Sequence, residues 1–171
     1  MSTHFVTIAL GGNKGDVIAA FRLTEKRLIE NGIEIIRQSK LYRTKPLCQP
    51  NSPEVTDDYL NCVWSIKTKL SPEALLELLL QIEQLTGRIR KRRWDSRTLD
   101  LDILTFDQLK LSSSLLTIPH PELHKRAFVL VPLAEIEPEL IVVSREKTVK
   151  QLLSALNAPE QQIIDVINFQ L

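Results

Sequence analysis

The sequence predicts an α+β domain, an antiparallel sheet with two helices on one face. Two observations lead to this fold class. Apolar and polar residues alternate with a period of two in 59–69 and again in 98–104, which is typical of strands. Between these strands, Ser71 and Pro72 predict a helix start, because serine is a favoured N-cap and proline a favoured first helical residue.

The N-terminal part predicts a strand, a helix and a second strand. The apolar run 4–10 ends at two glycines and predicts a central strand. Residues 17–31 place apolar side chains on one helical face, which predicts a helix. Residues 33–42 begin with β-branched residues and predict a single strand. The segment 43–58 contains three prolines and predicts a long loop.

The remaining elements complete a recognisable order. The strand 59–69, the helix from Pro72 towards Gly87 and the strand 98–104 extend the series to βαββαβ. That order is the ferredoxin-like split βαβ unit. Beyond it, 129–136 predicts a short apolar helix. The C-terminal part, 148–156 and 160–171, predicts peripheral helix and strand additions.

Length and composition predict one compact domain over residues 1–171. The hydrophobic content of 43% and the charged content of 25% are ordinary for a globular protein. The two cysteines, Cys48 and Cys62, fit neither a metal spacing nor a disulfide framework. The sequence contains no signal peptide pattern and no apolar run of membrane-spanning length, so we expect a cytoplasmic protein that does not bind a membrane.

Positive charge is concentrated in the window 88–97. Six cationic residues stand there against one acid, a local charge of +5, whereas the whole chain carries +1. Such a window suits a compact anionic ligand. We also expect it to be mobile when empty and to become ordered over a bound polyphosphate, because its like charges repel each other without a ligand.

Two aspartates follow this window. On a strand, Asp100 and Asp102 project from the same face with Cα atoms roughly 6.6 Å apart. Two carboxylates at this spacing can hold a pair of divalent ions ~3.5–4 Å apart, and their hard oxygens favour Mg²⁺. The alternative is an exposed strand with two solvated acids. The neighbouring arginines favour a polyphosphate–Mg²⁺ complex.

Three further patterns each allow two interpretations. The glycine-rich turn 11–16 either presents backbone N–H groups to an anion or is a plain turn. Tyr59 and Asn61 on one strand face either hold a planar heterocycle or cover the strand end. His120 and His124 suggest a metal pair, but no third ligand has a supporting pattern, so we do not expect zinc.

Two other function classes remain open from these residues. A ferredoxin-like sheet with a basic loop is also found in RNA-binding modules, although few exposed aromatic residues are expected here. A metal-dependent nucleotidyl transferase or nuclease would explain the aspartates and arginines equally well, but not a pocket for a heterocycle. A salt-dependent mobility shift with RNA would favour the first of these classes.

The motifs taken together are similar to a known family. LGGN, LYRTKPL, DYLN, GRIRKRRW, RTLDLDIL and IPHPELHKRAFVLVPL, in this order over residues 5–140, resemble the 6-hydroxymethyl-7,8-dihydropterin pyrophosphokinases of the folate pathway. The resemblance implies a ferredoxin-like fold. It also implies transfer of pyrophosphate from ATP to 6-hydroxymethyl-7,8-dihydropterin, with two Mg²⁺ ions as cofactors. We therefore expect small-molecule partners, no nucleic acid and a monomer.

The resemblance also implies roles for individual residues. The catalytic set would be Arg88, Arg97, Asp100 and Asp102, with the two aspartates binding both metal ions. Further nucleotide-binding residues would be Glu83, Trp94, Ile103, His120 and Arg126. The pterin site would comprise Thr44, Leu47, Tyr59, Asn61, Trp94 and Phe128, with the rings of Tyr59 and Phe128 on either side of the pterin. The chain departs from the family pattern at Gly12, where a serine is usual.

Overall fold

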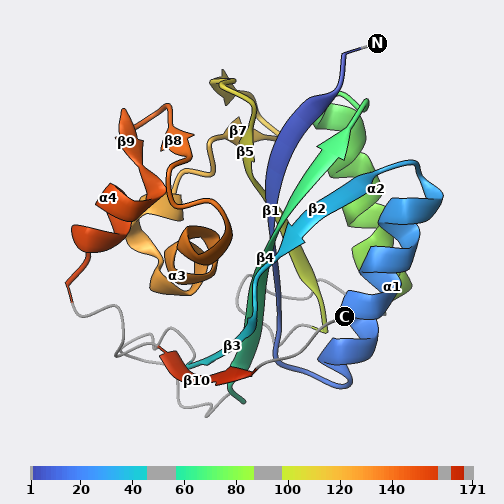
Figure 1. The fold of residues 1–171 in the computed structure, drawn as a ribbon. Coiled ribbons are helices and arrows are strands. Elements are labelled where there is room, and N and C mark those ends of the chain that lie inside the picture. Colours follow the sequence, from blue (N-terminus) through green and yellow to red (C-terminus); the bar gives the residue numbers. More distant parts are fainter. Residues whose placement is uncertain (1, 46–56, 87–97, 158–162, 168–171) are drawn as a thin grey trace.

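The fold is a twisted antiparallel sheet with helices on both faces (Figure 1). A computed structural model describes residues 2–45, 57–86, 98–157 and 163–167. The first two helices share one face of the sheet, as the βαββαβ order predicts, and the C-terminal elements cover the other face. The expected ferredoxin-like fold is confirmed.

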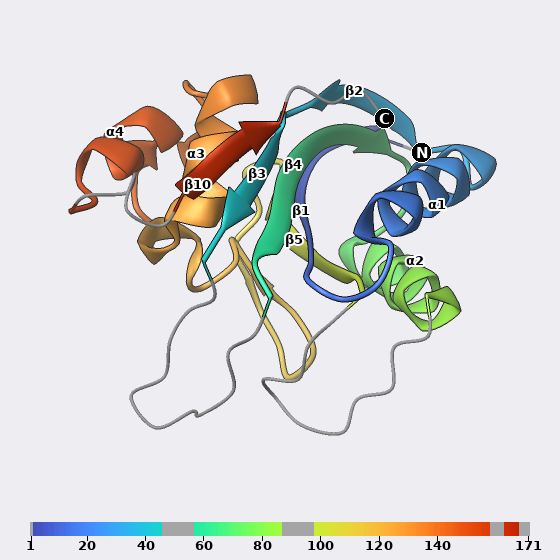
Figure 2. The same cartoon turned by 90° about the horizontal axis from the view of Figure 1, so that it is seen from below.

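Three long strands form the centre of the sheet. The strand β1 (His4–Gly12) lies between β4 (Tyr59–Thr68) and β5 (Asp100–Phe106), and both pairings are antiparallel. Two short strands, β3 (Leu41–Thr44) and β10 (Ile163–Ile167), extend the sheet beyond β4. The strand order is therefore β10-β3-β4-β1-β5, which can be followed in Figure 2.

The main core lies between the sheet and the helices α1 (Val17–Glu30) and α2 (Pro72–Leu85). Both helices begin as the sequence predicts: the side chains of Asp16 and Ser71 accept hydrogen bonds from backbone N–H groups of the first turn. The inward-facing strand residues are buried against them, among them Val6, Ile8, Leu10, Cys62, Trp64, Ile66, Leu99, Leu101 and Ile103. These residues alternate with those of the other sheet face.

The prediction of one strand over 33–42 is wrong. The chain forms two strands there, β2 (Glu34–Gln38) and β3, which pair with different halves of β4. At the break, the Ser39 hydroxyl accepts the N–H of Val63 at 3.0 Å. A serine side chain that takes a backbone hydrogen bond replaces a regular ladder contact, which explains why the strand ends at this residue.

The second face of the sheet is covered by α3 (Ala127–Ile136), and α4 (Val149–Ser154) packs against α3. The first of these begins two residues earlier than 129–136, and its buried side chains pack on Val63 and Leu104. The connecting elements are β6 (Leu111–Ser112), β7 (Thr117–Ile118), η1 (Leu123–Lys125), β8 (Ile141–Val142) and β9 (Lys147–Thr148). Within the described ranges, no helix is long and apolar enough to cross a membrane.

Polar contacts fix the position of α3 on the sheet. The Tyr42 hydroxyl donates to the Glu135 carboxylate at 2.7 Å, and Arg37 donates to the Ile136 carbonyl at 2.9 Å. Burial, followed by the hydrogen bond and the negative charge of Glu135, raises the pKa of Tyr42. Because a cationic side chain at a helix C-terminus is favourable, Arg37 stabilises both the helix end and its docking.

Candidate active site

The two aspartates of β5 lie on the sheet face that α3 partly covers. Asp100 is opposite Gly11 and Asp102 opposite Ala9 on the neighbouring strand β1. The residues between and after them, Leu101 and Ile103, are buried in the main core on the opposite face. The side chain of Asp102 is 42% exposed. The expected arrangement of two carboxylates on one face of a strand is therefore present.

Gly11, which has no side chain, separates these carboxylates from a polar pair formed by Asn61 of β4 and Thr44 of β3. Asn61 and Asp100 both pair with Gly11, one from each side. A Cβ atom at Gly11 would lie 2.8 Å from Oδ1 of Asn61, so only glycine leaves this amide undisturbed. The Nδ2 of Asn61 donates to Oγ1 of Thr44 at 2.7 Å. This bond fixes which way the amide points, so the acceptor and donor sides of Asn61 are oriented in advance.

His120 faces the carboxylates from the segment that follows β7. Its backbone N–H donates to the Leu104 carbonyl at 2.8 Å, which attaches this segment to β5. Its Nε2 lies 4.0 Å from Oδ2 of Asp102. Its Nδ1 accepts the Glu122 N–H at 3.2 Å.

These contacts determine the proton state of His120. Burial lowers its pKa, and this effect outweighs the opposing influence of Asp102, while the charge of Arg126 acts in the same direction as burial. The imidazole is therefore neutral near pH 7. Since Nδ1 is an acceptor, the proton sits on Nε2, directed towards the carboxylate side. His120 can thus offer an Nε2–H donor on the side of Asp102.

Arg126 and Phe128 begin α3 beside His120. The guanidinium carbon of Arg126 lies 5.8 Å from the ring centroid of Phe128, within the range of a cation–π contact. Phe128 itself is half-buried against the apolar side chains between α3 and the sheet. A cation and an aromatic ring are therefore placed at the same edge of the site. His124, by contrast, contacts Arg145 and does not join this group.

Glu83 lies in a different place from the other predicted residues. It is 2% exposed on the inner side of α2, and its Oε1 accepts the Leu101 N–H at 2.7 Å. That amide belongs to the backbone between the two aspartates, so Glu83 holds β5 from the helix side. The sequence signal for this was present: Glu83 continues the apolar stripe of Leu75 and Leu79.

The structure describes some of the other predicted site residues but not all of them. Tyr59 starts β4 opposite Thr44 and shares the face of Asn61. The side chain of Ile103 is in the main core, so its only route to a nucleotide is through its backbone on the terminal strand β5. Four predicted residues lie outside the described ranges: Leu47, Arg88, Trp94 and Arg97.

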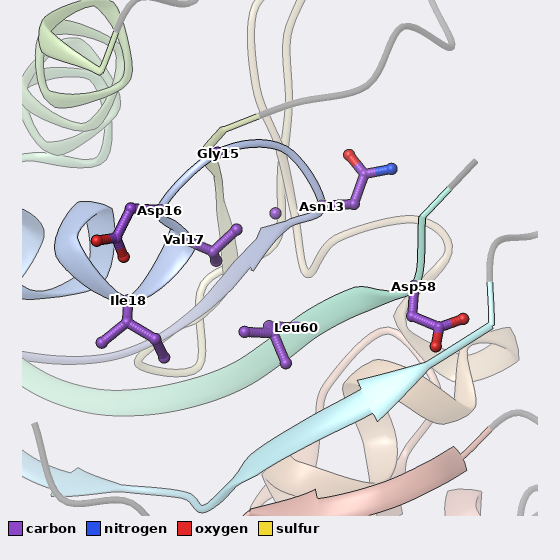
Figure 3. A pocket seen from close by; sticks show the side chains of 8 residues that line it. Asn13, Gly15, Asp16, Val17, Ile18, Asp58 and Leu60 are labelled. Carbon is purple, nitrogen blue, oxygen red and sulfur yellow. The ribbon is translucent and has the colours of Figure 1, made fainter.

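A hollow of about 540 Å³ lies at the end of β1, between the turn that precedes α1 and the start of β4 (Figure 3). Val17 and Leu60 form its apolar wall, and Asn13 stands at its rim, where it donates to the Asp57 carbonyl. Because Val17 and Leu60 belong to the helix side of the sheet, this hollow is separate from the aspartate face. The departure at Gly12 has a reason here: a Cβ atom would lie 2.4 Å from the Thr98 carbonyl oxygen.

In the described part of the chain, no group of three or more potential metal ligands is assembled. The fold and the site together define a class: an α+β protein with a ferredoxin-like sheet, on one face of which two carboxylates, an imidazole and a guanidinium lie near one another.

Comparison with known proteins makes the assignment specific. A model of the 7,8-dihydro-6-hydroxymethylpterin-pyrophosphokinase (HPPK) family matches residues 7–138. The chain belongs to this family, and it is therefore an enzyme of the transferase class. The family membership decides against an RNA-binding module and against a nucleotidyl transferase or nuclease.

Relatives and solved structures agree with this family. A 2-amino-4-hydroxy-6-hydroxymethyldihydropteridine pyrophosphokinase of Synechocystis is 40% identical over 156 residues, which cover 90% of this chain and 77% of that protein. One of Methylorubrum extorquens is 38% identical over 88% of this chain and 92% of its own length. A crystal structure of Plasmodium falciparum HPPK-DHPS superposes with a TM-score of 0.68 at 18% identity, over 90% of this chain. The chain spans 45% of that fused protein, and the likeness shows the fold.

Proposed function

We propose that this chain transfers the β,γ-pyrophosphoryl group of ATP to the hydroxymethyl oxygen of 6-hydroxymethyl-7,8-dihydropterin and releases AMP, a step of folate biosynthesis. The observation that carries the proposal is the arrangement around Gly11. On one side of this glycine stand Asp100 and Asp102, and on the other stands Asn61, oriented by Thr44. In this proposal, the aspartates belong to a phosphate-binding half and Asn61 to a heterocycle-binding half, and the two halves are adjacent on one sheet face.

The nucleotide half has the charges that a triphosphate requires. Arg126 offers a permanent cation, and neutral His120 offers an Nε2–H donor beside Asp102. The two aspartates are the residues that would hold Mg²⁺, which when bound supplies charge neutralisation for the phosphate oxygens. Arg88, Arg97 and Trp94 are proposed to complete this half, on the basis of the sequence resemblance alone.

The pterin half is built for a flat ligand with alternating donors and acceptors. The amide of Asn61 is held by the Thr44 hydroxyl, so its free oxygen and remaining N–H can pair with a ring edge. Tyr59 and Phe128 are the aromatic residues that we propose for the two faces of the ring. Leu47 completes this half in the proposal.

The reaction needs placement and electrostatic stabilisation more than a protein nucleophile. The alcohol oxygen bonds to the β-phosphorus while the bond from that phosphorus to the α,β-bridging oxygen breaks. This oxygen leaves on AMP, and the alcohol proton passes to solvent. His120 is not the base, because its Nδ1 already accepts the Glu122 N–H and its Nε2 carries the proton.

The test is the formation of AMP from ATP with and without the pterin alcohol. We expect AMP only when the pterin alcohol is present. We also expect that a chelator stops AMP formation and that added Mg²⁺ restores it. Asp100→Asn should remove most turnover and leave the melting curve unchanged, because Asp100 is a partly exposed side chain. Near-normal AMP formation by this variant contradicts the metal assignment.

A further inference from the structure

The C-terminal strand β10 lies outside the part of the chain that matches the family model, which ends at residue 138. It nevertheless joins the main sheet and pairs antiparallel with β3 (Figure 2). In this register, Ile163 is opposite Thr44, the residue that orients Asn61. The side chain of Ile167 packs against the main core. The strand is therefore a structural addition that touches the pterin half of the site.

The strand β3 needs this neighbour. It has only four residues, and three of them, Tyr42, Arg43 and Thr44, are in register with β4. Four register pairs with β10 supply its other edge. Since a short strand is held by few backbone hydrogen bonds, loss of one neighbour removes about half of the ladder that fixes Thr44.

Charged side chains connect the same three segments. Arg43 lies 3.7 Å from Asp165 of β10 through Nη2, and 4.0 Å from Asp58 through Nε. Figure 3 shows Asp58 at the start of β4. Arg43 thus joins β10 to the point where the chain enters β4, directly before Tyr59. The two ends of the segment between β3 and β4 are held together by one guanidinium.

We propose that β10 supports the pterin-binding edge of the sheet and that Asp165 is a positioning residue for the pterin, acting through Arg43. This inference rests on the proposed function, because it concerns the same site. The support acts on Thr44, Asn61 and Tyr59, and it reaches α3 of the nucleotide half indirectly, through the hydrogen bond from Tyr42 to Glu135. The expected signature is therefore a rise in the KM for the pterin that is clearly larger than any rise in the KM for ATP.

Three variants of the full chain and one truncation test this. Asp165→Asn should raise the pterin KM about twofold, the size of effect that an exposed ion pair supports. Asp165→Glu should restore the wild-type value, because it keeps the charge. Truncation after Asn157 should raise the pterin KM about tenfold, since it also removes the strand pairing. Glu139→Gln, an exposed acid before β8, is the matched control and should change nothing.

The outcomes separate this inference from the proposed function. Unchanged pterin KM values in Asp165→Asn and in the truncation overturn it, as does an equal rise of the KM for ATP. Should the truncated chain fail to fold, the variants Asp165→Asn and Asp165→Glu alone decide. If the wild-type chain forms no AMP at all, the proposed function fails. Amide hydrogen exchange of residues 41–44 then decides about β10, because faster exchange without the strand is expected.

Discussion

Replacement of Glu83 by leucine tests whether a buried carboxylate holds the two predicted metal ligands at their spacing. Its Oε1 accepts the N–H of Leu101 at 2.7 Å, and this amide belongs to the backbone between Asp100 and Asp102. Leucine fills a similar space but accepts no hydrogen bond. The Leu101 N–H then loses this acceptor in a place where Glu83 is only 2% exposed.

The magnitude follows from the cost of a buried donor without a partner, about 1–3 kcal/mol. For a domain of this size, 1 kcal/mol lowers the unfolding midpoint by roughly 2–4 °C, so a loss of about 2 kcal/mol lowers it by about 4–8 °C. Glu83→Gln keeps an acceptor oxygen and should cost about 1 kcal/mol or less. We also expect lower AMP formation in the leucine variant, because the carboxylates on either side of Leu101 lose their fixed spacing.

Thermal unfolding followed by circular dichroism, together with the AMP assay, measures both effects. Glu77→Leu on the exposed side of the same helix is the matched control and should leave the midpoint within about 1–2 °C. A Glu83→Leu protein that has the unfolding midpoint of the wild type and forms AMP at the wild-type rate would show that this contact does not position β5.

Three further substitutions test other parts of the site and fold. Gly11→Ala should raise the pterin KM several-fold and leave the KM for ATP unchanged. The new Cβ would lie 2.8 Å from Oδ1 of Asn61, so the amide has to move. A pterin KM equal to that of the wild type refutes this. Tyr42→Phe removes the hydrogen bond to Glu135 and should lower the free energy of unfolding in urea by about 1–3 kcal/mol. His120 has a lowered pKa in the fold, so it destabilises the folded state as pH falls through its ordinary value near 6.5. His120→Gln should therefore lose less stability than the wild type between pH 7.5 and pH 5, measured as the fall in melting temperature.

The local patterns of this chain predicted most of the strands and helices. The apolar face of residues 17–31, the cap at Ser71 and the alternation in 59–69 are short-range signals, and each of them corresponds to the element it predicted. The break at Ser39 was not predictable, because it depends on a hydrogen bond to Val63, which is distant in sequence. A pattern of residue types does not show which of two partner segments a strand will pair with.

In the site, too, some features follow from local sequence patterns and others depend on contacts between distant segments. The common face of Asp100 and Asp102 follows from a period of two and needs no tertiary information. The role of Gly11, by contrast, depends on Asn61 lying directly across β1 from β4. The resemblance implies that Glu83 binds the nucleotide, which stays a prediction, and the contact of its carboxylate with the Leu101 N–H became visible only in the structure.

The sequence by itself therefore determined the fold class, the order of its first elements, the family and the pair of aspartates, because periodicity and motif spacing are properties of neighbouring residues. The position of α3 on the second sheet face, and the acceptance of the Glu122 N–H by the Nδ1 of His120, are known only from the tertiary structure. The same holds for β10, which pairs next to Thr44. These facts depend on register, burial and contacts between segments far apart in the chain, which no local pattern contains.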